Sequence, residues 1–222
     1  MRRRVLGTVH APVVGVLVAL LLPLGSAHAQ EASAPTTAAT QVKTLICIRH
    51  GEKTSTEEGQ LNAKGLNRAL ALPQVLTSRY GRPQFIFAPD PAQMTGPKDH
   101  PVCYVRPLAT IEPTAIFLGM PVSTLLGFND IDGLEAELNK PQYGNALVFI
   151  AWEHRLLDKF VQNEVVHHGG DGAQVPPWPG KDYDSIYIVK LTGPPGGKKA
   201  TFTLEHEGLD NVSPTFPASP NP

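Results

Sequence analysis

Two short apolar runs that end abruptly in charged residues constrain the fold of this chain more than any other feature. The run LICI at 45–48 is followed directly by RHGEK at 49–53, and the run ALVFIA at 146–151 is followed by Trp152, Glu153 and His154. Apolar runs of this length suit buried strands, and the charged residues after them do not. In open α/β sheets ligands bind at the carboxyl ends of strands, so each charged end is a candidate site. The alternative is a core strand that simply reaches the surface there.

The remaining apolar patterns alternate between strand-like and helix-like segments. We expect strands at 45–48, 85–88, 122–125, 146–151, 185–191 and 200–204, and helices at 66–80, 107–118, 132–138 and 155–166, with a loop at 89–103 and a hairpin turn at 193–197. This alternation predicts an α/β fold, a three-layer α/β/α sandwich with a mostly parallel central sheet. In that geometry the ends of strands 45–48 and 146–151 lie on one edge, so His50 and His154 are expected to face each other across a cleft.

The first 29 residues have the features of a secretory signal peptide. Three arginines at 2–4 precede an apolar stretch at 13–22, and Ala27-His28-Ala29 is a small-residue cleavage site. The alternative is a membrane anchor, but the apolar stretch is interrupted by Gly15 and is short for a membrane span. We therefore expect cleavage before Gln30 and a periplasmic or secreted protein without stable membrane association.

The charge of the remaining chain excludes some classes of partner. Removing residues 1–29 takes three arginines and no acid from 19 basic and 20 acidic residues, which leaves a net charge of −4. No basic patch for nucleic acid or an anionic membrane is expected from this balance. The length suits one domain, predicted at 42–208, with a disordered linker at 30–41 and a disordered, Pro-rich tail at 209–222.

Only two cysteines, Cys47 and Cys103, occur in the chain. A single disulfide between them is compatible with an oxidising compartment, but two cysteines are not a disulfide framework. Cys47 lies within an apolar run, where a thiol behaves as a small hydrophobic side chain. No neighbour of either residue indicates a catalytic thiol, and the pairing of the two cysteines is left open.

Four motifs in a fixed order resemble one enzyme family. RHGEK at 49–53, LNAKGLNRA at 61–69, RPLAT at 106–110 and AWEH at 151–154 resemble the histidine phosphatase superfamily, which has a phosphoglycerate mutase-like fold. The resemblance covers about residues 43–191. An Arg-His-Gly tripeptide alone is a weak signal, but its position after a first strand and the order of the later motifs make the combination specific.

The resemblance implies a role for each charged residue of these motifs. His50 would be the nucleophile that forms a phosphohistidine, which suits a neutral imidazole because it attacks without losing a proton. Arg49 and Arg106 would bind the phosphate through planar, bidentate hydrogen bonds, and His154 would donate to a phosphoryl oxygen. Glu52 would orient its neighbours rather than react. The family implies no metal or other cofactor.

The sequence does not identify a single residue as the general acid. In the acid phosphatase branch an Asp follows the second His, but here Arg155 occupies that position. In the mutase-like branch a carboxylate lies between the second Arg and the second His. Asp130 and Asp132 are the preferred candidates, with Asp132 also able to cap a helix. The remaining candidates in that interval are Glu112 and Glu135.

Taken together, these patterns predict an exported, metal-independent phosphatase acting on a phosphomonoester or a phosphoprotein through a phosphohistidine on His50. The alternatives are a phosphomutase of the same fold and a weakly active protein that binds a phosphorylated ligand. Export argues against a mutase, since the glycolytic substrates of mutases are cytoplasmic. The sequence indicates neither the particular substrate nor the oligomeric state.

Overall fold

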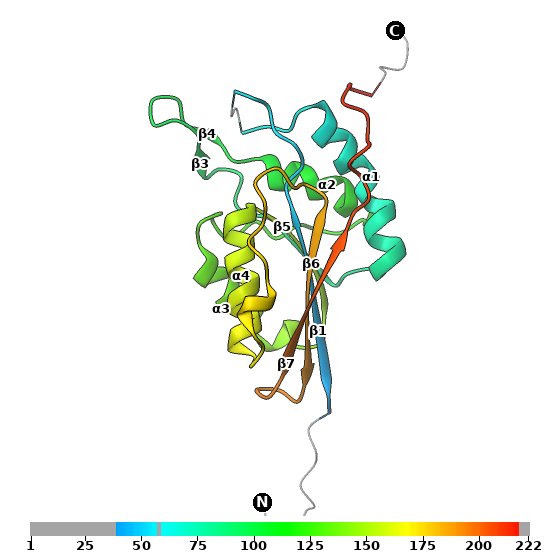
Figure 1. Ribbon diagram of the computed structural model, residues 1–222, viewed down its shortest axis with the longest axis vertical. Coiled ribbons are helices and arrows are strands. Elements are labelled where there is room, and N and C mark those ends of the chain that lie inside the picture. The colour runs from blue at the N-terminus through cyan, green and yellow to red at the C-terminus, as the bar shows by residue number, and fades with distance from the viewer. Residues whose placement is uncertain (1–38, 57–58, 218–222) are drawn as a thin grey trace, which may run out of the picture. The chain divides into compact units, whose positions relative to one another are not determined.

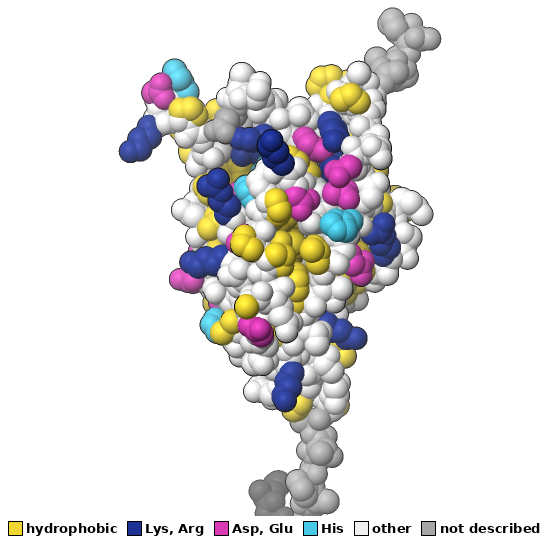
Figure 2. All heavy atoms as spheres, in the orientation of Figure 1, with side chains coloured by type: hydrophobic (Ala, Val, Ile, Leu, Met, Phe, Trp, Pro, Cys, Tyr) yellow, Lys and Arg dark blue, Asp and Glu magenta, His cyan; other side chains and the backbone are white. Residues whose placement is uncertain are grey.

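The computed structural model describes residues 39–56 and 59–217, and in it a central sheet is covered by helices on both faces (Figure 1). The predicted signal peptide lies outside the described residues, as does most of the predicted linker. The domain begins slightly earlier than expected, because Gln41 already belongs to the first strand. On the face shown in Figure 2, basic and acidic side chains are interspersed.

The central sheet has five strands in the order β2-β5-β1-β6-β7. Its strands are β1 (Gln41–Arg49), β2 (Phe85–Phe87), β5 (Leu147–Trp152), β6 (Ser185–Gly193) and β7 (Lys199–His206). The β1–β5 and β2–β5 pairs are parallel, and the β1–β6 and β6–β7 pairs are antiparallel. The α/β sandwich is confirmed, but the sheet is mixed rather than mostly parallel in its pairing. The short connection between β6 and β7 explains why these two strands are antiparallel, since a short hairpin can only join antiparallel strands. The β1–β6 pair is antiparallel as well, which the apolar patterns do not indicate.

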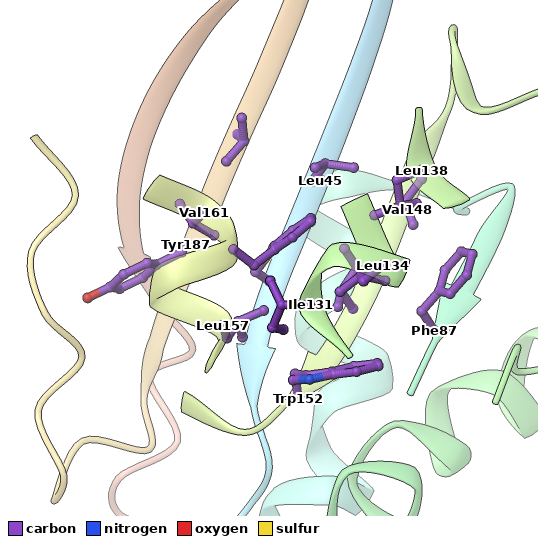
Figure 3. Close-up of a cluster of buried hydrophobic side chains, with 14 of the residues drawn as sticks. Leu45, Phe87, Ile131, Leu134, Leu138, Val148, Trp152, Leu157, Val161 and Tyr187 are labelled. Atoms are coloured by element: carbon purple, nitrogen blue, oxygen red, sulfur yellow. The ribbon is translucent and has the colours of Figure 1, made fainter. Parts of the chain in front are cut away.

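The helices form a layer on each side of this sheet. Helices α1 (Ala63–Tyr80) and α2 (Arg106–Leu118) cover one face, and α3 (Ile131–Leu138) and α4 (His154–His167) cover the other. The alternation of β1 shows why both faces are buried: Leu45 and Cys47 pack in the core under α3 and α4, whereas Ile46 and Ile48 pack under α1 and α2. Figure 3 shows the first of these cores.

Several local features differ from the sequence-based expectations. The α1 helix starts at Ala63 because the side chain of Asn62 caps it by accepting from Gly65 N. In α3 the cap is Asp130, which accepts from Gly133 N, so the assignment of Asp132 as the cap is wrong. The expected strand at 122–125 is reduced to a single bridge between Ser123 and Phe87.

The expected loop at 89–103 contains a small antiparallel ribbon of β3 (Met94–Thr95) and β4 (Val102–Cys103). Two short 3-10 helices, η1 (Pro141–Tyr143) and η2 (Gly172–Gln174), complete the described elements. Within residues 39–56 and 59–217 no helix is both long enough and apolar enough to span a membrane.

Part of the predicted disordered tail is packed against the domain. Asn67 in α1 donates from Nδ2 to the carbonyl oxygens of Ser213 (2.8 Å) and Thr215 (2.6 Å), and Leu209 packs against the core under α1 and α2. The tail as predicted therefore starts too early, because Leu209, Ser213 and Thr215 have specific partners in the domain. The two cysteines are both free, with Cys47 buried and Cys103 exposed.

Candidate active site

The two charged strand ends lie side by side, as the sequence predicts. Strands β1 and β5 are parallel neighbours with Arg49 opposite Trp152, and the amide of His50 donates to the carbonyl of Trp152 at 3.1 Å. The segments that follow the two strands therefore leave the sheet at the same edge. His50 and His154 are brought together around Glu153, whose carboxylate acts electrostatically on both imidazoles.

His50 is buried and held in one tautomer. Its side chain is 3% exposed, and Nδ1 lies 2.8 Å from the carbonyl oxygen of Gly51. Because a carbonyl oxygen can only accept, Nδ1 carries the proton and Nε2 keeps its lone pair. Burial lowers the pKa of His50 to about 3, and the positive charges of Arg106 and Arg49 act in the same direction. The imidazole is thus a neutral base with a free Nε2 at physiological pH.

The turn after His50 is held by close backbone packing. A Cβ on Gly51 would lie 3.0 Å from both Cα and the carbonyl oxygen of Gly65 in α1, so no larger residue fits without a shift. The amide of Gly51 donates to Thr110 Oγ1 at 2.8 Å, and that hydroxyl donates to the carbonyl of Arg106 at 2.8 Å. Thr110 therefore links the His50 turn to the first residue of α2, where Arg106 lies.

Both arginines of the predicted phosphate site are buried, and neither has a carboxylate partner among residues 39–56 and 59–217. Arg49 is 3% exposed and donates from Nη1 to the carbonyls of Gly180 (3.0 Å) and Asp182 (2.8 Å). The Nε of Arg49, and the Nε and Nη1 of Arg106, have no hydrogen-bond partner within the described residues. Burial lowers the pKa of Arg49. Buried charges normally need an opposite charge, so these donors are suited to an anionic ligand.

Two tyrosines flank His50 and stack on the arginines. The Cζ of Arg49 lies 3.8 Å from the centroid of the Tyr183 ring, and that of Arg106 lies 4.7 Å from the Tyr104 ring. The same two rings have their centroids 6.1 Å and 6.0 Å from the His50 ring. Sequence analysis missed both tyrosines, since each lies in an irregular segment whose folding onto the sheet edge has no local signal.

His154 is the first residue of α4 and is supported by the residue before it. Glu153 caps the helix by accepting from Leu156 N at 3.0 Å, and its other oxygen lies 2.7 Å from Nδ1 of His154. Burial raises the pKa of the Glu153 carboxyl, but the contacts with His154 and Leu156 outweigh it, and the pKa lies below its ordinary value. Glu153 is therefore ionised next to His154. Glutamate is not among the residues that are preferred at an N-cap, so sequence analysis had no cap signal at this position.

The carboxylates considered as general acids have other partners or none at this site. Asp130 caps α3, and Asp132 is exposed in the first turn of that helix. Glu135 accepts from Asn163, and Glu112, the remaining candidate, is half-buried in α2. Glu52, which was expected to orient its neighbours and not to act as the acid, binds Arg68 through both oxygens at 2.9 and 3.0 Å. Within the described residues neither Asp130 nor Asp132 has a hydrogen bond or ion pair with the site. Their acid role stays a prediction.

No protein-family model and no curated protein matches this sequence. Solved structures do match: the proposed phosphohistidine phosphatase SixA from Nakamurella multipartitia has a TM-score of 0.54 at 14% identity, over 77% of this chain and 98% of that one. The protein histidine phosphatase SixA complexed with tungstate has a TM-score of 0.50 at 16% identity, over 74% of this chain and 97% of that one. A proposed alpha-ribazole-5'-P phosphatase from Escherichia coli K-12 has a TM-score of 0.52 at 11% identity, over 80% of this chain and 99% of that one. The chain therefore has the fold of the histidine phosphatases, as the sequence motifs imply.

Proposed function

We propose that this chain is an exported, metal-independent phosphatase that hydrolyses a phosphomonoester or a phosphoprotein through a phosphohistidine on His50. The observation that carries the proposal is the environment of His50. A buried, neutral imidazole is exposed to the positive charges of two buried guanidinium groups that have no carboxylate partner among the described residues. A dianionic phosphoryl group supplies the missing charge.

Substrate binding follows from the unpaired donors. The Nε of Arg49 and the Nε and Nη1 of Arg106 donate to the phosphoryl oxygens, and each charge-assisted bond is stronger than a neutral one. The guanidinium groups have contacts before the substrate arrives: that of Arg49 with the carbonyls of Gly180 and Asp182, and that of Arg106 with the face of the Tyr104 ring. Such preorganised donors stabilise the charge that spreads over the equatorial oxygens during transfer.

Transfer to His50 requires no prior deprotonation. The Nε2 lone pair forms the bond to phosphorus as the bond from phosphorus to the leaving oxygen breaks. The resulting imidazole is positively charged, and the Nδ1–H bond to the Gly51 carbonyl disperses that charge. His154, held by the ionised Glu153, donates to a phosphoryl oxygen. Water then attacks the phosphohistidine, and His50 is released with inorganic phosphate.

Two further observations support parts of this proposal. The solved SixA structure with tungstate shares this fold, and tungstate is a tetrahedral oxyanion like phosphate. Export is supported by the basic start, the apolar stretch and the small-residue cleavage site of residues 1–29.

The test is an assay of the exported form, residues 30–222, on a generic aryl phosphate. We expect wild-type protein to release phosphate with and without EDTA, and the His50→Ala variant to release none while melting near the wild-type temperature. His100→Ala, which removes an exposed histidine from a loop, is the matched control and should be fully active. A wild-type protein that binds phosphate without turnover would favour the binding-protein alternative. Loss of activity in EDTA with recovery on adding Zn²⁺ or Mg²⁺ would exclude the metal-independent mechanism.

A further inference from the structure

Tyr104 lies beside His50, and its hydroxyl is buried in the site. Tyr104 is 1% exposed, and its hydroxyl makes no hydrogen bond of normal geometry with the described residues, although the Arg106 guanidinium lies close enough to counteract the increase in its pKa that burial causes. Its ring meets that of His50 edge-on, with the centroids 6.0 Å apart. The charges of Arg106, Glu153 and Arg49 all act on this hydroxyl. A buried hydroxyl without a well-formed hydrogen bond destabilises the folded state, so its retention needs a reason.

The proposed reaction lacks one component that a hydroxyl could supply. When a phosphate ester is cleaved, the leaving oxygen must take up a proton unless the free anion is stable. The carboxylates near His50 are poorly suited: Glu52 is bound to Arg68, and Glu153 is ionised between His154 and Leu156 N. Burial raises the pKa of Tyr104, so its phenol is fully protonated at physiological pH.

We propose that Tyr104 is the general acid that protonates the leaving oxygen of a phosphomonoester, an inference that rests on the proposed phosphatase function. As His50 Nε2 bonds to phosphorus, the bond to the ester oxygen breaks and that oxygen takes the phenolic proton. The product is an alcohol, a phosphohistidine and a tyrosinate. The guanidinium groups of Arg106 and Arg49 stabilise the tyrosinate. In the second step water attacks phosphorus, its proton returns to the tyrosinate oxygen, and His50 is freed.

A proton-donating Tyr104 and a purely structural Tyr104 predict different effects when the hydroxyl is removed. If Tyr104 only supports the His50 ring, removing its hydroxyl should affect all substrates equally, because every substrate uses the same nucleophile. If Tyr104 donates a proton, the loss should depend on the leaving group. An oxygen that is stable as an anion needs no donor, whereas an alkoxide needs one.

The experiment compares wild-type protein with Tyr104→Phe on 4-nitrophenyl phosphate, phenyl phosphate and glycerol 2-phosphate. We expect kcat/KM of the variant to fall by less than about threefold on the nitrophenyl ester and by about 10²- to 10⁴-fold on the alkyl ester. Tyr143→Phe is the matched control. Tyr143 belongs to the core under α3 and α4, and its hydroxyl donates to Glu137. This control substitution should lower kcat/KM equally on all three esters, or not at all.

A uniform loss across the three esters, or no loss on the alkyl ester, overturns the assignment of Tyr104. If Tyr104→Phe does not fold, the wild-type protein still gives a test, because a proton donor makes kcat/KM depend weakly on the leaving group and a steep dependence contradicts it. Failure of the proposed function looks different: a His50→Ala variant would then hydrolyse all three esters like wild type. A wild-type protein inactive on all three esters would reject both proposals.

Discussion

Two buried arginines in this domain differ in the partners of their guanidinium groups. Arg68 in α1 is fully buried and contacts the carboxylates of four residues, which are Glu52 (2.9 Å), Glu207 (2.6 Å), Asp184 (3.2 Å) and Asp210 (3.1 Å). Arg106, 7% exposed, has no carboxylate partner among the described residues and two nitrogens without any hydrogen bond. The first charge is compensated within the chain, and the second is left for a ligand. A buried arginine is therefore informative about function only together with its partners.

The Arg68 cluster, defined as Arg68 with these four carboxylates, has a structural role close to the site. Glu52 follows the His50-Gly51 turn, Asp184 precedes β6, and Glu207 follows β7. One guanidinium thus connects the end of β1 to the neighbouring end of the β6–β7 hairpin. Asp184 also accepts from the amides of Gly208 and Leu209, which extends the connection into the segment after β7.

The largest expected effect on stability is at Arg68. The Arg68→Met variant removes the cation that Glu52 and Asp184 share and leaves the buried Glu207 without its hydrogen-bond donor, and removing one partner of a buried pair costs about 3–5 kcal/mol. The free energy of unfolding from urea titration measures this loss. Arg82→Met, which removes an exposed arginine, should change the free energy of unfolding by less than about 0.5 kcal/mol. A loss below about 1 kcal/mol in Arg68→Met would show that the cluster is not stabilising.

The effect at Arg106 should appear in catalysis and not in stability. Arg106→Lys keeps the charge but loses the planar pair of donors, and a charge-assisted hydrogen bond is worth about 1.5–3 kcal/mol. We expect kcat/KM to fall by roughly 10- to 150-fold, with the free energy of unfolding within about 1 kcal/mol of wild type. Steady-state kinetics and urea titration of the same samples decide the outcome. Wild-type kinetics in Arg106→Lys would remove this residue from the phosphate site.

A smaller effect concerns the pH dependence of the Arg68 cluster. Burial raises the pKa of Glu207 to about 8 in spite of Arg68, and the charges of Asp184 and Glu52 add to the increase. Between the ordinary value of 4.5 and about 8, the folded state holds a proton that the unfolded state has lost. The contribution of Glu207 to stability is therefore greatest below this range and declines as pH rises, by at most about 1.4 kcal/mol per pH unit.

The Glu207→Gln variant tests whether Glu207 makes the stability decline as pH rises. Glutamine keeps the shape and does not titrate, so the free energy of unfolding should depend less on pH between 6 and 8 than in wild type. Urea titrations at these two pH values give the difference. If the free energy of unfolding depends on pH in the same way in the wild-type protein and in Glu207→Gln, the carboxylate is already ionised in the folded state and its predicted raised pKa is wrong.

The sequence predicted the parts of the site that are set by strand ends, because these have a local signal. Apolar runs stopped by Arg49-His50 and Glu153-His154 imply two buried strands, and parallel neighbours must end on the same edge. Tyr104 and the partners of Arg68 could not be predicted in this way. Arg68 meets Glu207 across 139 residues, and nothing in the pattern around either residue specifies that contact.

The direction of β6 was also not predictable from apolar periodicity. An apolar strand has the same pattern in either orientation, and the direction of β6 is seen only in its antiparallel register with β1. The tail was assigned from composition alone. Its prolines and small residues are typical of disorder, but the two hydrogen bonds from Asn67 hold part of it against α1.

The most direct test of the central claim is to trap the phosphoenzyme. Phosphate on an imidazole nitrogen is stable in alkali and labile in acid, so a rapid alkaline quench of protein mixed with labelled substrate should retain the label. We predict label on the peptide that contains His50, none in His50→Ala, and slower labelling of the same peptide in His154→Ala. Label on a serine or aspartate, or turnover by His50→Ala, would contradict the assignment of His50 as the nucleophile.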